Sequence, residues 1–282
     1  MCFITNLFKK NKTVETIDGS RALLVGVNNY PNAPLRGCVN DVTNMANFLV
    51  DNGYFQSSQI RILTDERATT QNILERLDWL VTGLKAGDKV YFHYSGHGCL
   101  FAGRSKSGAV EGITNVFCPV DFDWSEDRMI TDIQLVDIFE HIPSGVIFNW
   151  VSDSCHSAGL SSVTDRKVTF YNHPRSYPVP VDIFWRLKSA KELNLYQSRE
   201  FINGVLDIGF LSGCKKDQTS ADAFINNSYN GAFTYYLIDN LKHYKDLSLK
   251  DLMVKINEAL LSAGYKQQPQ AEGARTLKAW LK

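Results

Sequence analysis

The chain has 282 residues, of which 44% are hydrophobic, so it can fold around a packed core and is not a disordered protein. Thirty basic and thirty acidic residues cancel, which excludes a chain-wide field for binding nucleic acid or an acidic membrane surface. No apolar run reaches membrane-spanning length, so we expect neither nucleic acid nor a membrane among the partners.

The start of the chain lacks the pattern of a secretory signal. Its short apolar patch precedes the first charges, whereas a signal peptide has charges first and a longer apolar stretch. Residues 1–20 are therefore predicted to be a flexible leader. The six cysteines are widely spaced without a C-x-x-C pair, which indicates reduced thiols, not a disulfide framework. We expect a cytoplasmic protein.

Short apolar runs alternate with amphipathic segments in the first half of the chain. Strands are predicted at 21–27, 59–64, 89–94 and 146–152, and helices at 38–50 and 70–84. This alternation predicts parallel β-α-β units with right-handed crossovers, in a sheet covered by helices on both faces. Between residues 98 and 144 we expect loops and one helix, at 131–141.

The second half begins with a change of character. Residues 160–203 are polar and basic and contain three prolines, so they are predicted to form an irregular connection. A strand at 206–212, helices at 231–243 and 248–263, and a last strand at 276–281 are predicted to complete the fold. The elements together predict a single α/β domain with about six mostly parallel strands.

A thiol and an imidazole follow two of the predicted strands. Cys155 follows the strand at 146–152, and His97 follows the strand at 89–94. Open parallel sheets bind ligands beyond the carboxyl ends of their strands, so both side chains are expected in one cleft. An adjacent imidazole is the usual activator of a cysteine nucleophile. The backbone N–H groups of Gly98 and Cys155 are candidates for an oxyanion hole.

The sequence also allows other roles for these residues. Either residue alone is more often a buried structural side chain, and only their placement at two strand ends favours catalysis. Zinc binding by His97, Cys99, Cys155 and His156 is a further alternative, but neither Cys-His cluster has zinc-finger spacing.

Two aspartates lie near the same end of the predicted sheet. Asp153 projects to the same side as Cys155, where an unpaired carboxylate would raise the pKa of the thiol. A cationic substrate side chain bound to Asp153 would remove this penalty. Asp41 starts the helix after the first strand, and the residues alone favour a role as a helix N-terminal charge.

Five segments of the chain resemble the metacaspases and orthocaspases, which are caspase-like cysteine peptidases of clan CD, family C14. They lie within about residues 20–270 and are 21–41, 94–98, 118–121, 153–157 and 211–222, the last followed by 231–235. The resemblance implies a caspase-like fold and a catalytic dyad, in which His97 deprotonates Cys155 and then protonates the departing amine. It also implies a pocket for the residue before the cut bond, lined by Cys38, Asp41, Ser95 and Asp153. Two carboxylates in this pocket would bind an Arg side chain of the substrate well and would also bind Lys. The resemblance therefore assigns Asp41 to substrate binding instead of to a helix N-terminal charge.

The resemblance also divides the peptidase domain, residues 21–282. It implies a large-subunit-like part at 21–165, a connecting loop at 166–203 and a small-subunit-like part at 204–282. An enzyme that cuts after basic residues is able to cut itself in such an exposed loop, although an uncut solvated loop fits the sequence equally well. The basic residues concerned are Arg166, Lys167, Arg175, Arg186, Lys188, Lys191 and Arg199. Cys214 and the segment 217–222 are interpreted as a structural loop that braces the cleft.

Many family members bind calcium through several aspartates. Here residues 110–117 contain no aspartate, 129–132 keep only Asp132, and 161–164 read Ser-Ser-Val-Thr where another aspartate is expected. Four hard oxygen ligands are not in evidence, so no cofactor is expected to be required and calcium dependence is doubtful. Asp132 is the only candidate metal ligand.

The sequence therefore predicts a cysteine endopeptidase that cuts proteins or peptides after Arg or Lys. It is expected to be a monomer, with a regulatory protein partner left open. One alternative is a caspase-fold pseudo-enzyme or regulatory interaction module, and another is a clan hydrolase with a different specificity or transpeptidase activity. The intact dyad and both acidic residues favour the peptidase.

Overall fold

The structure is a computed structural model that describes residues 19–155, 172–196, 208–215 and 218–282. The predicted leader at 1–20 therefore falls almost wholly outside the described residues, as does the stretch 161–164.

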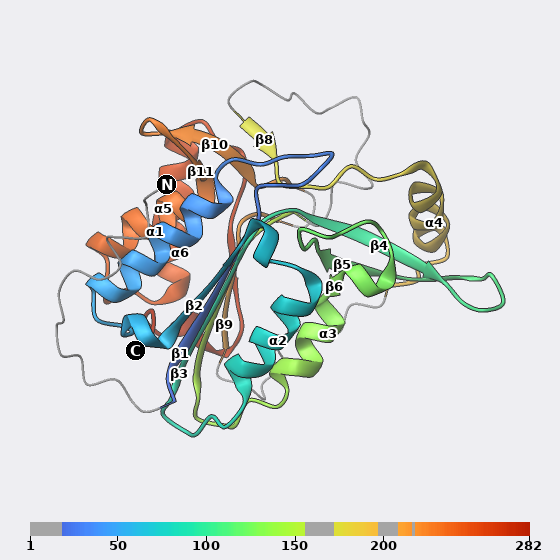
Figure 1. Cartoon of the computed structure of the whole chain (residues 1–282). Coiled ribbons are helices and arrows are strands. Elements are labelled where there is room, and N and C mark those ends of the chain that lie inside the picture. The colour runs from blue at the N-terminus through green and yellow to red at the C-terminus, as the bar shows by residue number, and fades with distance from the viewer. Residues whose placement is uncertain (1–18, 156–171, 197–207, 216–217) are drawn as a thin grey trace.

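A six-stranded sheet forms the centre of the molecule (Figure 1). The strand order is β12-β9-β7-β3-β1-β2, and every neighbouring pair is parallel except β12 with β9. The strands are β1 (Arg21–Gly26), β2 (Ile60–Thr64), β3 (Lys89–Ser95), β7 (Ile147–Asp153), β9 (Ile208–Ser212) and β12 (Gln270–Glu272). The predicted mostly parallel sheet of about six strands is confirmed.

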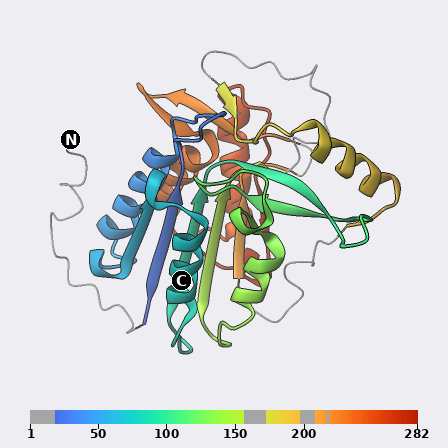
Figure 2. The same ribbon diagram turned by 45° about the vertical axis from the view of Figure 1, so that its right-hand side comes forward.

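Helices cover both faces of this sheet, as predicted (Figures 1 and 2). One face carries α1 (Cys38–Asp51), α5 (Ala232–His243) and α6 (Leu249–Ser262), and the other carries α2 (Thr70–Val81) and α3 (Asp132–Phe139). Successive strand residues point to opposite faces, so β1 supplies Leu23 to one apolar core and Leu24 to the other. A sheet buried on both faces explains why its strands are almost continuously apolar.

Two smaller sheets lie beyond the central one. β4 (Gly98–Arg104), β5 (Val110–Phe117) and β6 (Ile130–Thr131) pair antiparallel, where only loops and a helix were predicted. β8 (Asn172–Pro174), β10 (Ala221–Ile225) and β11 (Ser228–Gly231) form the second. Short 3₁₀ helices occupy Ser57–Gln59, Asp65–Arg67, Glu126–Arg128 and Ala274–Leu277.

The connection predicted to be irregular is partly regular. It contains β8 and the helix α4 (Val181–Glu192). Helix α4 buries Ile183, Leu187 and Ala190, which share one helical face. That spacing was present in the sequence, but the prolines before the helix favoured a loop.

The last predicted strand, at 276–281, is wrong. The chain makes a 3₁₀ helix at Ala274–Leu277 and only an isolated β-bridge at Ala279, and the strand that joins the sheet is β12 instead. Buried Arg275 donates hydrogen bonds to the carbonyl groups of Ala279 and Lys282, which holds the end of the chain in a turn. Within the described residues, no helix has both the length and the apolar character needed to span a bilayer.

Candidate active site

The two strands that lead to the site are neighbours in the sheet. β3 and β7 pair with Ser95 opposite Asp153, so His97 and Cys155 each lie two residues beyond the last pair. Both side chains are buried. The N–H groups of Gly98 and Cys155 each donate to the same carbonyl oxygen, that of Arg175, at 3.1 Å. Both predicted oxyanion donors therefore meet at one peptide group, that of Arg175.

The Cys155 thiol is held by the small-subunit-like part of the chain. The backbone N–H of Ser220 donates to its Sγ atom, and Cys214 Sγ lies 3.7 Å away. Burial raises the pKa of Cys155 above its ordinary value, and the neighbouring thiol of Cys214 raises it further. The sulfur therefore stays protonated until a base removes its hydrogen.

The His97 ring is oriented by a backbone carbonyl. Its Nε2 atom lies 2.6 Å from the carbonyl oxygen of Ala33. A carbonyl only accepts hydrogen bonds, so Nε2 carries the ring hydrogen and Nδ1 carries a free lone pair. Nδ1 is buried and forms no hydrogen bond within the described part of the chain. Burial lowers the pKa of His97 to about 4, although the Ala33 carbonyl acts in the opposite direction.

Three carboxylates surround the guanidinium group of Arg175. Its Nη2 atom lies 2.7 Å from Asp41 Oδ2 and 3.0 Å from Asp222 Oδ1, and its Nη1 atom lies 3.3 Å from Asp153 Oδ2. Nη1 also donates to Ser95 Oγ at 2.6 Å. All four charged side chains are buried, so this is a closed acidic pocket with a cation inside it.

Each carboxylate has hydrogen-bond donors besides the guanidinium. Asp41 Oδ1 accepts from the backbone N–H of Gly231 at 2.8 Å. Asp153 accepts from Ser220 Oγ at 2.5 Å and from Thr234 Oγ1 at 2.7 Å. Asp222 accepts from the backbone N–H groups of residues 36 and 37, both at 2.9 Å. The pocket is therefore preorganised by elements that do not include Arg175.

The charges in the pocket do not balance, because three carboxylates face one guanidinium. Burial raises the pKa of Asp41 to about 6 despite the opposing effect of Arg175. For Arg175, burial alone would lower the pKa, but the three carboxylates outweigh it and hold the pKa above its ordinary value. The pocket would be strongly unfavourable without a cation, since unpaired buried charges are costly.

Arg175 reaches the pocket from a segment that crosses the strand ends. β8 pairs antiparallel with β10, and the N–H of Arg175 donates to the carbonyl of Ser220 at 3.0 Å. Beyond Arg175, the N–H of Tyr177 donates to the carbonyl of Gly98 at 3.1 Å. The segment is thus an added extended strand whose arginine side chain fills the acidic pocket.

The structure brings most of the predicted site residues together. The backbone N–H groups of Gly98 and Cys155 donate to the Arg175 carbonyl, and the backbone of Arg175 also acts on the pKa of His97, raising it. Asp41, Ser95 and Asp153 contact the side chain of Arg175. Cys38 is also part of the pocket: burial raises its pKa, and the charges of Arg175, Asp222 and Asp41 all act on it.

Other residues of the site were not predicted. Asp222 was interpreted as part of a bracing loop, yet it is the third carboxylate around Arg175. Tyr30 accepts a hydrogen bond from the N–H of His97 at 2.9 Å, and Ser220 contacts both Cys155 and Asp153. Asp222 lies inside the segment 211–222, which resembles the family. That resemblance was the one sequence signal that could have pointed to a role for Asp222 in the site.

Asp132 lies apart from this cluster, at the start of α3. Its two carboxylate oxygens accept hydrogen bonds from Thr114 Oγ1 and Asn115 Nδ2, both at 2.7 Å. Neutral donors thus satisfy both oxygens, and the described residues contain no group of three or more acidic, histidine or cysteine side chains that could hold a metal ion.

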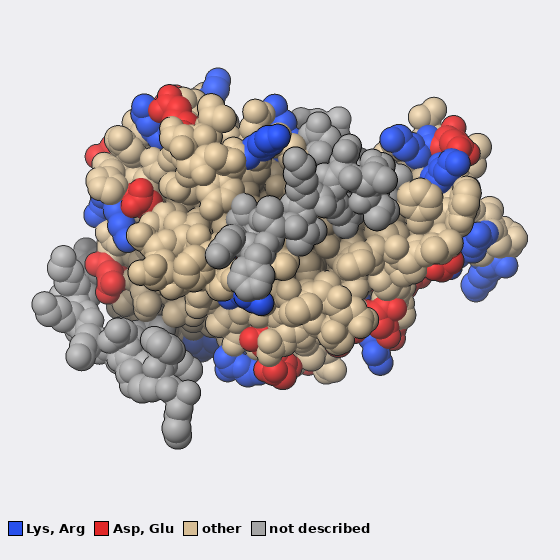
Figure 3. All heavy atoms as spheres, turned by 90° about the horizontal axis from the view of Figure 1, so that it is seen from above, with Lys and Arg blue, Asp and Glu red and all other residues tan. Residues whose placement is uncertain are grey.

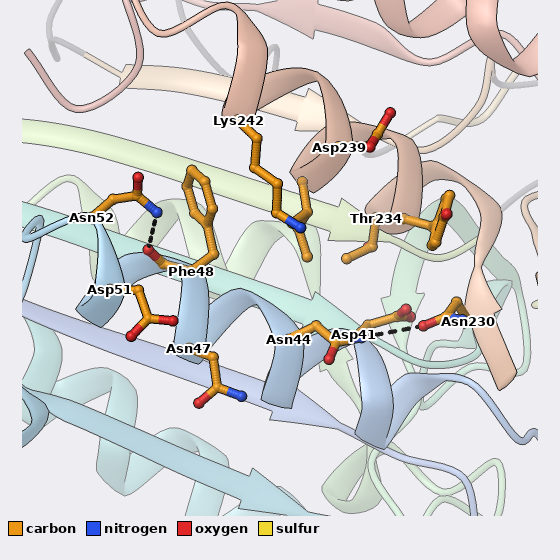
Figure 4. Close-up of a pocket in the computed structure, with 12 residues that line it drawn as sticks. Asp41, Asn44, Asn47, Phe48, Asp51, Asn52, Asn230, Thr234, Asp239 and Lys242 are labelled. Carbon is orange, nitrogen blue, oxygen red and sulfur yellow. Dashed lines mark hydrogen bonds between the residues drawn. The ribbon is translucent and has the colours of Figure 1, made fainter. Parts of the chain in front are cut away.

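A separate cavity of about 330 Å³ lies between α1 and α5 (Figure 4). Asp41 lines its inner end, where Asn44 donates to Asn230 at 3.3 Å. Neither His97 nor Cys155 lines this cavity, so it adjoins the acidic pocket without being the reaction cleft.

Comparison with protein families shows which family the chain belongs to. Residues 20–164, about half of the chain, match the family model of the metacaspase peptidase C14 domain. The chain belongs to the metacaspases. This metacaspase is 31% identical over 89% of its length to Metacaspase-1 of Scheffersomyces stipitis, covering 69% of that protein. It is 28% identical over 91% of its length to Metacaspase-1 of Mycosarcoma maydis, covering 71% of that protein.

The fold of the metacaspase also matches a solved structure. A crystal structure of a protein from Geobacter sulfurreducens superposes with a TM-score of 0.66, covering 92% of this chain and 96% of that one at 23% identity. The resemblance inferred from the sequence motifs is therefore confirmed, and the metacaspase is a cysteine peptidase with a caspase-like α/β fold.

Proposed function

We propose that this metacaspase is an endopeptidase that cuts after Arg, and more slowly after Lys, through a dyad of His97 and Cys155. The observation that carries the proposal is the position of Arg175. Its carbonyl oxygen accepts from both Gly98 and Cys155, while its side chain pairs with three buried aspartates. The residue therefore occupies the site as a substrate residue would.

The chemistry follows from these contacts. Nδ1 of His97 takes the hydrogen of the Cys155 thiol, and the thiolate attacks the carbonyl carbon of the arginine residue. The N–H groups of Gly98 and Cys155 stabilise the oxyanion that forms. The C–N bond then breaks, His97 returns the proton to the departing amine, and a thioester joins the arginyl carbonyl to Cys155. Water, deprotonated by His97, hydrolyses the thioester and restores the thiol.

The pocket contacts favour Arg over Lys. Both terminal nitrogens of Arg175 are used, Nη2 by Asp41 and Asp222 and Nη1 by Ser95 and Asp153. A lysine ammonium group supplies one nitrogen and cannot reproduce this fork. The loss of one charge-assisted contact corresponds to roughly a tenfold difference in rate.

Fluorogenic peptides that end in Arg, Lys or Asp test the proposal. The Arg peptide is expected to be cut about ten times faster than the Lys peptide and the Asp peptide not at all. Cys155→Ala is expected to abolish turnover, and His97→Ala to lower it at least about a hundredfold. Equal rates for the Arg and Asp peptides would refute the acidic pocket, and turnover by Cys155→Ala would refute the dyad.

We also propose that the metacaspase cuts itself between Arg175 and Ser176. This bond lies at the oxyanion donors, and its cleavage would free the acidic pocket for other substrates. Intact-mass measurement of incubated protein should show a break after residue 175 in the wild type, and no such break in Cys155→Ala or Arg175→Ala. The matched control is Arg186→Ala, which removes an arginine of α4 in an exposed ion pair with Asp182. Persistence of the same break in Arg175→Ala would contradict the assignment.

One observation favours a second candidate, a caspase-fold interaction module without turnover. Arg175 fills the pocket through fully buried ion pairs. In a protein without turnover, these ion pairs would serve to stabilise the fold. The same peptide assay separates the two: a scaffold cuts nothing, even in Arg175→Ala, where the pocket has lost its internal arginine.

We further propose that the enzyme acts as a monomer in the cytoplasm. The described cysteines form no disulfide, and these include Cys99 and Cys118, whose sulfur atoms lie 3.7 Å apart. Such thiols suit a reducing compartment. Gel filtration with light scattering tests the monomer, and cell fractionation tests the location.

A further inference from the structure

Tyr177, two residues beyond Arg175, lies in a cage of aromatic rings. Its ring centroid is 5.1 Å from that of Phe122, 5.4 Å from His97, 5.7 Å from Tyr30 and 6.1 Å from Trp124. All four ring pairs are edge-to-face, which is the favourable geometry for aromatic contacts. Only 5% of Tyr177 is exposed.

The backbone fixes the position of Tyr177 relative to the reacting bond. The Arg175 carbonyl lies at the two oxyanion donors, and the next residue, Ser176, forms a β-bridge with Gly98. The N–H of Tyr177 then donates to the carbonyl of Gly98, and Gly98 N–H is itself one of the oxyanion donors. Tyr177 therefore occupies the place of the second residue after a cut bond.

The cage does not depend on the segment that fills it. Tyr30 comes from the loop after β1, His97 follows β3, and Phe122 and Trp124 follow β5. Cage members also contact one another, with Tyr30 and His97 at 4.5 Å and Phe122 and Trp124 at 4.9 Å between centroids. Departure of the 172–177 segment would leave an aromatic hollow beside the catalytic imidazole.

Backbone strain at Trp124 supports a functional role for the cage. Trp124 has φ 73°, a left-handed conformation that is costly for a bulky side chain. Such strain persists where the surrounding structure enforces it, and it is concentrated at ligand clamps and active sites. Here the strained residue directs an aromatic ring toward Tyr177.

We propose that the cleft contains an aromatic subsite for the second residue after the cut bond, formed by Tyr30, His97, Phe122 and Trp124. Its ligands are peptides in which Arg is followed by a small residue and then by Tyr, Phe or Trp. The small residue corresponds to Ser176, which is buried at 3% exposure. The inference rests on the proposed function, because that function defines Arg175 as the residue before the cut. The chain's own Arg-Ser-Tyr sequence is one example of the preferred ligand.

Two internally quenched peptides test the subsite. They carry the same sequence up to and including Arg-Ser and differ only in having Tyr or Ala next. The measurement uses the Tyr177→Ala chain, in which the metacaspase no longer fills its own cage. We expect kcat/KM to be about ten times higher for the Tyr peptide, the discrimination typical of an apolar pocket. A ratio within twofold of one would overturn the proposal.

Cage variants locate the effect. In the Tyr177→Ala background, Trp124→Ala and the milder Phe122→Leu should each reduce the Tyr-to-Ala ratio to below about three. The matched control is Trp185→Ala, which removes a tryptophan that is 55% exposed on α4 and should leave the ratio unchanged. A reduction by Trp185→Ala equal to that by Trp124→Ala would also overturn the assignment.

A substrate with no residue after the cut bond separates this proposal from the proposed function. If an Arg-aminocoumarin peptide is cut but the Tyr and Ala peptides are cut equally, the subsite is absent and the peptidase stands. If nothing is cut, the proposed function fails, and the affinities of the two peptides for the Tyr177→Ala chain, measured by fluorescence anisotropy, still decide the subsite. Tighter binding of the Tyr peptide by about tenfold supports it, and equal affinity refutes it.

Discussion

Asp222 illustrates how the acidic pocket tolerates three like charges in a buried place. Its carboxylate accepts hydrogen bonds from the backbone N–H groups of Arg36 and Gly37 and pairs with Arg175. Each donor stabilises the ionised form, so the charge is kept without water. The pocket is therefore built to hold a cation and not merely to accommodate one.

The residue-scale prediction concerns this third carboxylate. Arg36 N–H donates to one oxygen of Asp222, and Gly37 N–H and Arg175 donate to the other. Asp222→Asn keeps one of these two oxygens, replaces the other by an NH2 group and removes one negative charge from the pocket. We expect kcat/KM for the Arg peptide to fall roughly ten- to a hundredfold, mainly through KM, because a charge-assisted hydrogen bond contributes about 1.5–3 kcal/mol. Asp239→Asn, an exposed acid in the separate cavity between α1 and α5, is the control and should leave kcat/KM unchanged. A loss of less than twofold in Asp222→Asn would show that two carboxylates suffice.

The sequence could predict the position of a site residue where the signal was local, but not where the contacts join distant parts of the chain. His97 and Cys155 were identified because each directly follows a strand, and the structure places both ends side by side. Arg175 was one of seven basic residues with no local feature that singled it out. Its role depends on Asp41, 134 residues away, and on Asp222, 47 residues away.

At the scale of elements, the central sheet was predictable and its additions were not. The continuous apolar runs gave strands β1, β2, β3 and β7 to within one residue at each end. β8 has no such run, because the sequence Asn-His-Pro becomes a strand only by pairing with β10. Pairing of this kind is a tertiary contact, so no local pattern announces it.

The element-scale prediction concerns the junction of β5 with α3. Asp132 begins α3, and both its oxygens are satisfied by Thr114 and Asn115 of β5. A lone carboxylate with neutral neighbours is a poor calcium site. We expect the rate on an Arg peptide to agree within about twofold between a chelator and millimolar calcium. The measurement is a calcium titration of initial rates, with magnesium as the control for ionic strength.

A stimulation by calcium of tenfold or more would contradict this expectation. Asp132→Asn would then show whether Asp132 is a calcium ligand. If it is, the rate of the Asp132→Asn enzyme should no longer respond to calcium. A response that survives Asp132→Asn would place the ligands elsewhere in the chain.

At the scale of the whole molecule, the charges that matter for function are hidden. Viewed from above, toward the end of the molecule where β8 lies, basic and acidic side chains are interspersed around the periphery (Figure 3). The three pocket aspartates and Arg175 are buried. The chain has a net charge of zero and therefore no chain-wide field. If the enzyme cuts after basic residues, as we propose, that selectivity arises from contact inside the pocket.

Burial of ionisable groups also sets how the stability of the fold depends on pH. Burial lowers the pKa of His93 to about 3 and that of His97 to about 4, from an ordinary value of 6.5. As pH falls from about 6.5 to 4, the unfolded chain binds protons at both histidines while the folded chain does not. Burial of Asp41, with its pKa near 6, acts in the opposite direction for one proton. In this pH range the unfolded chain binds two protons, at the histidines, and the folded chain binds one, at Asp41. These three groups together therefore make the folded state less stable as the pH falls.

The contribution of His93 to this loss can be measured separately. His93 is fully buried and hydrogen-bonds Tyr91 and Thr234, away from the reacting bond. Between pH 7 and pH 4.5 its lowered pKa should remove about 3 kcal/mol from the free energy of unfolding, because each pH unit between the unfolded and folded pKa values contributes about 1.4 kcal/mol. In His93→Gln the free energy of unfolding, measured by urea denaturation, should fall by about 3 kcal/mol less between pH 7 and pH 4.5 than it does in the wild type. His141→Gln, which alters an exposed histidine, should retain the full dependence. If both variants lose stability equally between pH 7 and pH 4.5, the buried imidazole of His93 is not a source of the acid sensitivity.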